Sequence, residues 1–185
     1  MILCITGRSG AGKTELSRIL EKMGFHIIEM GSIIKSEMEK EAIAPTPKNT
    51  KEFMLRIREL KGEEIIAKKI TEKILSQKEE NIAIIGVRSL KELEYFKKNI
   101  NDIKTIAVIS SQENRFSRLN KRGRSDDPKT LSEFINYREN NETKVGIDSV
   151  IENSEYTIEN SGTISDLERN VFLILKELQN NQSII

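Results

Sequence analysis

Short runs of apolar residues alternate with amphipathic stretches along most of this chain. Nearly continuous apolar runs are typical of strands buried on both faces of a parallel sheet, and they predict strands at residues 1–6, 25–30, 81–86, 103–110 and 156–159. Apolar positions at helical spacing predict helices at 15–23, 33–41, 50–77 (interrupted or bent near Gly62), 89–98, 113–121, 129–143 and 163–179. This alternation predicts an α/β fold of three layers, in which a parallel sheet of about five strands has helices on both faces.

The chain has 185 residues, which is enough for one domain with a substantial core. We see no internal repeat and no linker rich in Pro, Gly or Ser, so residues 1–185 are interpreted as a single domain. The Pro-containing stretch 44–50 and the polar loop 122–128 are interpreted as hinges of mobile inserts.

Composition narrows the functional classes. The formal net charge is +1, with 30 basic and 29 acidic residues, so no general attraction to nucleic acid or membranes is expected. Aromatic residues make up 5% and Trp is absent, which argues against a base-stacking surface. Cys4 is the one cysteine and His26 the one histidine, which leaves little for a disulfide, a zinc site or a His-based triad. The N-terminus enters a strand directly, without a signal peptide or an apolar run of membrane-spanning length, and we expect a cytoplasmic protein.

The candidate chemistry begins at Gly7–Thr14, which matches the phosphate-binding P-loop G-x-x-x-x-G-K-[ST]. The motif follows a predicted strand and opens a predicted helix, so the helix N-terminus turns its free N–H groups toward a polyphosphate. Lys13 is expected to reach the outer phosphates and to take part in catalysis, while the Thr14 hydroxyl is the candidate Mg²⁺ ligand. Arg8 is expected to project to solvent. The residues predicted to bind the nucleotide are Gly7, Ser9, Gly10, Ala11, Gly12, Lys13 and Thr14.

Further stretches, spread over nearly the whole chain, give it a family resemblance. They are Met30–Lys35, Gly86–Ser89, Arg122–Pro128 and Glu155–Gly162. With the P-loop, they resemble the nucleoside monophosphate kinases, above all the adenylate-kinase-related proteins of archaea, with features of dephospho-coenzyme A kinase. The resemblance implies a P-loop kinase fold with an acceptor-binding insert at about 31–78, a lid at about 122–128, and a nucleotide-base loop that includes Gly162. It also implies ATP and Mg²⁺ as cofactors.

Arginines near the predicted strand ends fit phosphoryl transfer, which depends on positioning and on positive charge. Arg88 is the candidate clamp on the acceptor phosphate, and Arg122 and Arg124 are candidates to close over the donor. Each of these has the alternative of a solvated surface charge, as have Arg56, Arg58 and Arg138. For the lid acids Asp126 and Asp127, two interpretations stay open: they order the lid arginines, or they cap the following helix.

Two positions depart from the family pattern. Ile85 and Ser32 stand where the family usually has Asp, so the carboxylate support of the metal is in doubt, and strand-end Glu29 is an uncertain substitute. The favoured function is ATP-dependent transfer to a nucleoside monophosphate or a similar phosphate-bearing molecule. AMP is favoured by the resemblance, and CMP, dCMP, UMP and dephospho-coenzyme A stay open, as does the oligomeric state. A non-catalytic nucleotide sensor is the alternative, and dephospho-coenzyme A kinase-like activity a further one.

Overall fold

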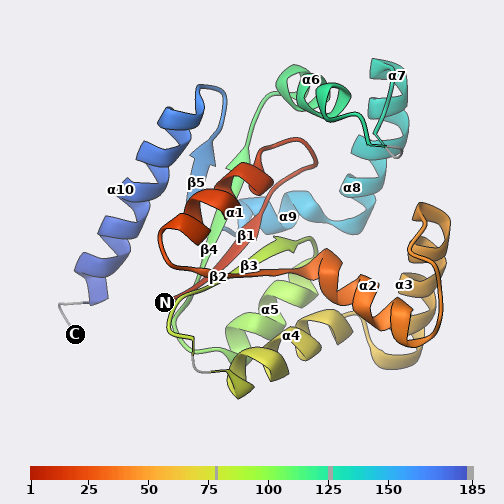
Figure 1. The fold of residues 1–185 in the computed structure, drawn as a ribbon, viewed down its shortest axis with the longest axis horizontal. Helices are drawn as coiled ribbons and strands as arrows, with labels where there is room; N and C mark the ends of the chain where they lie inside the picture. Colours follow the sequence, from red (N-terminus) through yellow and green to blue (C-terminus); the bar gives the residue numbers. More distant parts are fainter. Residues whose placement is uncertain (78, 125–126, 183–185) are drawn as a thin grey trace.

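A computed structural model describes residues 1–77, 79–124 and 127–182. Its sheet has five strands, all parallel, in the order β2-β3-β1-β4-β5 (Figure 1). The strands are β1 (Ile2–Thr6), β2 (His26–Glu29), β3 (Ile82–Val87), β4 (Ile103–Ile109) and β5 (Tyr156–Glu159). Each lies within two residues of its predicted bounds, and the predicted parallel sheet is confirmed.

Alternation of side chains along the strands divides the core in two. Leu3 and Ile5 of β1 pack with the helices α1 (Lys13–Lys22) and α10 (Ile164–Gln182) on one face of the sheet. Cys4 packs on the other face, with α4 (Ile65–Ser76), α5 (Leu90–Asn99) and α9 (Ile147–Glu152). The three-layer α/β arrangement is therefore as predicted (Figure 1). Within the described ranges, no helix is long and apolar enough to cross a membrane.

The predicted acceptor insert, as far as residue 77, contains α2 (Met30–Lys40), α3 (Pro47–Lys61) and α4. Helix α3 begins three residues before its predicted start because the side chain of Thr46 caps it, accepting a hydrogen bond from the N–H of Asn49 at 3.2 Å. Gly62 ends α3 with φ +94°, a conformation that side chains disfavour. The predicted interruption of the long helix is thus a complete break between two helices.

The segment after β4 differs most from the prediction. Arg122, expected in the lid loop, is the last residue of helix α6 (Gln112–Arg122). The helix predicted at 129–143 is present as one continuous helical segment over residues 131–145, which consists of α7 (Leu131–Glu133), a π-helical stretch η1 (Phe134–Glu139) and α8 (Asn140–Val145). Helix α9 was not predicted. Helix α7 starts at Leu131 because the Thr130 side chain caps it, in a capping box with Glu133. Lid residues 125 and 126 lie outside the described ranges.

Candidate functional site

The P-loop lies between β1 and α1, at the carboxyl ends of the strands, and its backbone is packed too tightly for side chains at two positions. Gly7 has φ +141°, and a Cβ there would lie 2.3 Å from the carbonyl oxygen of Val108 on β4. Gly10 has φ +80°, and its Cβ would lie 2.5 Å from the carbonyl oxygen of Arg115 on α6. Both glycines are therefore required by conformation and by space. Neighbouring elements hold the loop in shape, and the N–H of Ala11 donates within it to the carbonyl oxygen of Arg8 at 3.1 Å.

A second support reaches the P-loop from the loop after β5. Asn160, 7% exposed, donates from Nδ2 to the carbonyl oxygen of Ala11 at 2.8 Å. Arg118 on α6 donates to the same oxygen at 3.2 Å and to the carbonyl oxygen of Asn160 at 2.7 Å. The predicted residue of this loop, Gly162, is exposed two positions further on. Sequence analysis missed Asn160 and Arg118. The spacing of Arg115 and Arg118, one turn apart after a strand end, was the available signal.

Lys13 is half-buried at the start of α1 and carries the strongest electrostatic signal of the site. Its Nζ donates to the carbonyl oxygens of Gly7 at 2.5 Å and of Arg8 at 3.1 Å. The pKa of Lys13 is lowered to about 8, chiefly by loss of hydration and next by the positive charge of Arg88. Glu142 opposes this shift, and Arg115 and Arg122 add weaker lowering effects. Arg88 is predicted to bind the acceptor phosphate and Arg122 the donor. The charges of both arginines act on the P-loop lysine.

The turn that carries Arg88 follows an irregularity in the sheet. Ile5 pairs with Ile85, but Thr6 pairs with Val87, so Gly86 is left over and adopts φ +98°. The Thr6 hydroxyl donates to the carbonyl oxygen of Val87 at 2.8 Å and ties the two strand ends together. As a result, Arg88 leaves the sheet directly beside the strand that leads into the P-loop.

A single buried carboxylate fixes this turn. Oε2 of Glu92 accepts from the backbone N–H groups of Arg88 at 3.1 Å and Ser89 at 3.3 Å. Oε1 of Glu92 accepts from Nη2 of Arg58 on α3 at 3.2 Å. The backbone of the Arg88 turn is thus immobilised and linked to the insert, while the Arg88 side chain is exposed. A fixed backbone with an exposed side chain is the arrangement expected of a preorganised ligand-binding residue.

In the lid, one acid holds both predicted arginines. The Arg122 guanidinium donates from Nε to Oδ2 of Asp127 at 2.9 Å and from Nη2 to Oδ1, and the backbone N–H of Arg124 donates to Oδ2 at 2.9 Å. Burial alone would raise the pKa of Asp127, but these bonds and the nearby charge of Arg138 lower it. Thr130 caps the following helix, so Asp127, which binds Arg122 and Arg124, does not act as that cap. The Arg124 side chain is exposed.

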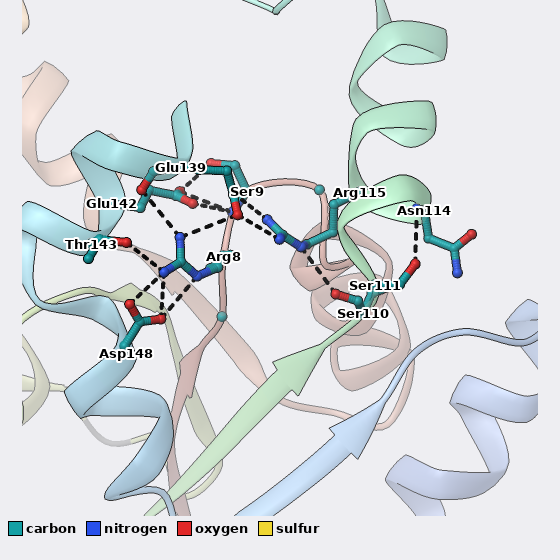
Figure 2. Close-up of polar contacts among 12 residues, drawn as sticks. Arg8, Ser9, Ser110, Ser111, Asn114, Arg115, Glu139, Glu142, Thr143 and Asp148 are labelled. Atoms are coloured by element: carbon teal, nitrogen blue, oxygen red, sulfur yellow. Dashed lines mark hydrogen bonds and ion pairs between the residues drawn. The ribbon is translucent and has the colours of Figure 1, made fainter. Parts of the chain in front are cut away.

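The expectation that Arg8 projects to solvent is wrong. Its guanidinium binds the Asp148 carboxylate on α9, with Nη2 2.6 Å and Nε 3.0 Å from Oδ1 (Figure 2). It also donates to Oγ1 of Thr143 at 2.8 Å and to the carbonyl oxygen of Glu139 at 3.3 Å. Although partial burial opposes it, the hydrogen bond that Arg8 donates to Asp148 raises the pKa of Arg8, together with the charges of Glu139, Asp148 and Glu142. Arg8 thereby fastens the segment after the lid to the P-loop.

A carboxylate of that segment sits on the P-loop itself. Glu142 on α8 accepts from the backbone N–H of Ser9, at 3.0 Å and 3.1 Å to its two oxygens, and from the Ser9 hydroxyl at 2.5 Å (Figure 2). The neighbouring Glu139 forms a two-pronged pair with Arg115, at 2.5 Å and 2.9 Å. None of these acids follows from the motif, because α8 reaches the loop only through the tertiary fold.

The residues present fit Mg²⁺ only if the nucleotide phosphates and water supply most of its ligands. Ile85 is 7% exposed and belongs to the same apolar cluster as Ala11, so the strand end offers no oxygen. Glu29, paired with Ile85 across β2 and β3, is exposed. Among the described residues, no group of three or more His, Cys, Asp or Glu side chains could hold a metal. The exposed Thr14 hydroxyl is the remaining candidate ligand, beside phosphate oxygens and water.

Comparison with known proteins places the chain in a family. A family described as "AAA domain" matches residues 3–145. The UPF0200 protein of Pyrococcus abyssi is 37% identical over 182 residues, covering 96% of this chain and 97% of the relative. The chain belongs to the UPF0200 family. A second member, from Pyrococcus furiosus, is 40% identical over 175 residues, covering 92% and 94%. The family name is silent on substrate, so activity must be argued from the site.

Solved structures show that this UPF0200 protein has a P-loop kinase fold. TT1252 from Thermus thermophilus superposes with a TM-score of 0.66 at 18% identity, covering 96% of this chain and 97% of the other. A gluconokinase from Sinorhizobium meliloti superposes with a TM-score of 0.61 at 13% identity, covering 98% and 95%. A shikimate kinase from Acinetobacter baumannii gives 0.52 at 19% identity, covering 95% and 93%. At these identities the likeness concerns the fold alone. The likeness to adenylate and dephospho-coenzyme A kinases therefore stays a prediction.

Proposed function

We propose that this protein is a kinase that transfers the terminal phosphoryl group of ATP to a small phosphate-bearing acceptor, with a nucleoside monophosphate such as AMP favoured. The observation that carries the proposal is the position of the Arg88 turn, which leaves β3 beside the strand that leads into the P-loop and is joined to that strand by the hydrogen bond from Thr6 to Val87. The charges of Arg88, which follows β3, and of Arg122, at the end of α6, also lower the pKa of the P-loop lysine. Three cations around one phosphate-binding loop are what a site for two phosphate-bearing substrates requires.

Each group then has a distinct task. The P-loop N–H groups and Lys13 hold the donor phosphates, and Arg88 holds the phosphate of the acceptor. Closure of Arg122 and Arg124 over the donor excludes water, which would otherwise take the phosphoryl group. The Thr14 hydroxyl and the phosphate oxygens would hold Mg²⁺, which would supply positive charge against the phosphates. An oxygen of the ionised acceptor phosphate bonds to the terminal phosphorus as the bond to ADP breaks, so the chain need not supply a base.

The insert supplies the candidate surface for the rest of the acceptor. Glu92 accepts hydrogen bonds from Arg58 on α3 and from the backbone N–H of Arg88, so the turn that carries Arg88 is joined directly to α3. Arg56 stacks over the ring of Phe53 at 5.4 Å and pairs with Glu41. These contacts place arginines and one aromatic ring on the element that the resemblance assigns to the acceptor.

A second candidate function is nucleotide binding without transfer. The observation in its favour is Ile85, a buried aliphatic side chain at the strand end where a carboxylate would assist the metal. A sensor of this kind would keep the P-loop and the lid but would hold ATP unchanged.

One experiment separates the two candidates. The protein is incubated with Mg-ATP and, in turn, AMP, CMP, dCMP, UMP and dephospho-coenzyme A, while ADP and the phosphorylated acceptor are quantified by chromatography. We expect acceptor-dependent ADP formation with at least one monophosphate, and its loss in Lys13→Met. Tight ATP binding without transfer to any acceptor would support the sensor instead. Arg169→Ala on α10, remote from the P-loop, is the control for loss of a surface arginine.

A further inference from the structure

The Ser9–Glu142 contact puts an internal anion on the P-loop. The backbone N–H and the hydroxyl of Ser9 both point to one carboxylate, whose residue is only 6% exposed. Paired N–H and hydroxyl donors of this kind are the groups with which such loops bind phosphate oxygens. Lys13, which should reach the outer phosphates, is meanwhile turned onto the carbonyl oxygens of Gly7 and Arg8.

We propose that Glu142 competes with the terminal phosphate of the nucleotide, and so determines how strongly the P-loop prefers a triphosphate over a diphosphate. This inference rests on the proposed function in that it takes the P-loop ligand to be a nucleoside polyphosphate. Glu142 lies close enough to Lys13 for its charge to act on the lysine ammonium. A terminal phosphate held by Lys13 therefore meets a like charge, whereas the inner phosphates, bound by the loop N–H groups closer to α1, do not.

The helix that carries Glu142 is fastened to the P-loop by side-chain contacts. Arg8 binds Asp148 and Thr143, which lie on either side of the α8–α9 junction at Gly146 (Figure 2). Glu139, one turn before Glu142, is held by Arg115. A movement of Glu142 together with α8 would break the Arg8 contacts to Thr143 and Asp148. Binding of a triphosphate is therefore coupled to movement of the segment that follows the lid.

The test is a comparison of ATP and ADP affinities in Glu142→Gln, measured by isothermal titration calorimetry with and without Mg²⁺. Glutamine keeps the size of the side chain and a neutral acceptor for Ser9, so the fold is preserved. We expect the affinity for ATP to rise about tenfold more than the affinity for ADP, because a charged hydrogen-bond partner and a like charge are both removed. Asp148→Asn, which weakens the hold of Arg8 on α9 and leaves Ser9 and Glu142 unchanged, should shift the ratio in the same direction by about threefold. Glu152→Gln removes an exposed charge from α9 and should leave the ratio unchanged.

Two results would overturn the proposal. One is an ATP-to-ADP ratio that Glu142→Gln leaves unchanged. The other is a Mg²⁺-dependent loss of ATP affinity, which would make Glu142 a support of the metal. If neither the wild type nor Glu142→Gln binds nucleotide, both this inference and the proposed function fail. Binding without transfer, with the ratio shifted as expected, would contradict the proposed function alone.

Discussion

Asn160 donates a hydrogen bond from its side-chain amide to the carbonyl oxygen of Ala11, 149 residues earlier in the chain, across 2.8 Å. The same amide nitrogen would lie 2.0 Å from a Cβ at Gly12, so it fills the space that this glycine leaves. The residue that follows the last strand, β5, thereby supports the P-loop. The shape of the P-loop depends on this contact as well as on its own glycines.

Loss of that support should be measurable as lost stability. Asn160→Ala deletes a buried hydrogen bond, and we expect the free energy of unfolding in urea to fall by about 1–3 kcal/mol, with weaker ATP binding. Asn153→Ala removes an amide that is exposed and bonded only within α9, and it should cost less than about 0.5 kcal/mol. Equal effects of the two substitutions would show that the Asn160 contact does not support the loop.

Lys13 should make nucleotide binding dependent on pH. Its pKa is lowered from 10.5 to about 8, so the free protein loses the ammonium charge as the pH rises through that value. We expect ATP affinity to fall by about tenfold between pH 7.5 and 9.5, measured by calorimetry. Lys13→Arg stays charged and should give a flat profile. A flat profile in the wild type would contradict the burial of Lys13.

The lowered pKa of Lys13 also affects stability. Between about pH 8 and 10.5 the unfolded chain binds more protons at this lysine than the folded protein does, so the free energy of unfolding rises with pH in that range.

Asp127 should contribute stability that acid removes. Its pKa is lowered below the ordinary value of 3.8, so the contribution is fully present above that pH and disappears as the pH falls through the lower folded value. Asp127→Asn should cost about 1 kcal/mol at pH 5, measured by urea unfolding, and markedly less at pH 2.5. A cost that is the same at both values would show that the Arg122 ion pair is not its source.

Ile85→Asp tests whether the strand end limits catalysis. A carboxylate in this buried apolar position should destabilise the fold by about 2–4 kcal/mol. We nevertheless expect a faster Mg²⁺-dependent turnover, since the acid would support the metal beside Thr14. Ile85→Asn has a similar size without the charge and should be destabilised without becoming faster. If both variants turn over at the wild-type rate, the missing carboxylate is not what limits transfer.

The parts that sequence analysis predicted are those with local signals. Apolar runs indicated all five strands, and the spacing from Gly7 to Thr14 was sufficient to locate the loop because strand, turn and helix are adjacent in the chain. The break at Gly62 was likewise visible in one residue. Local patterns of this kind depend on backbone conformation and burial, which a short stretch of residues largely determines.

The parts that it missed depend on distant segments. Arg8 had no visible reason to leave solvent, because its partner Asp148 lies 140 positions away on an unpredicted helix. Glu142 follows the π-helical stretch η1 and contacts Ser9, 133 residues earlier in the chain, and a helical repeat in the sequence reveals neither the π-helical stretch nor this contact. The carboxylates of the site were therefore sought at Ile85 and Ser32, whereas the fold brings one in from α8.

The claim that Arg88 and Lys13 belong to one two-substrate site is tested most directly by steady-state kinetics of Arg88→Ala with the best acceptor. We predict that kcat/KM for the acceptor falls about 100-fold, as expected for loss of a charged partner of phosphate, while the Kd for ATP stays within about threefold. An acceptor kcat/KM unchanged in Arg88→Ala, or an equal loss of ATP binding, would contradict the account.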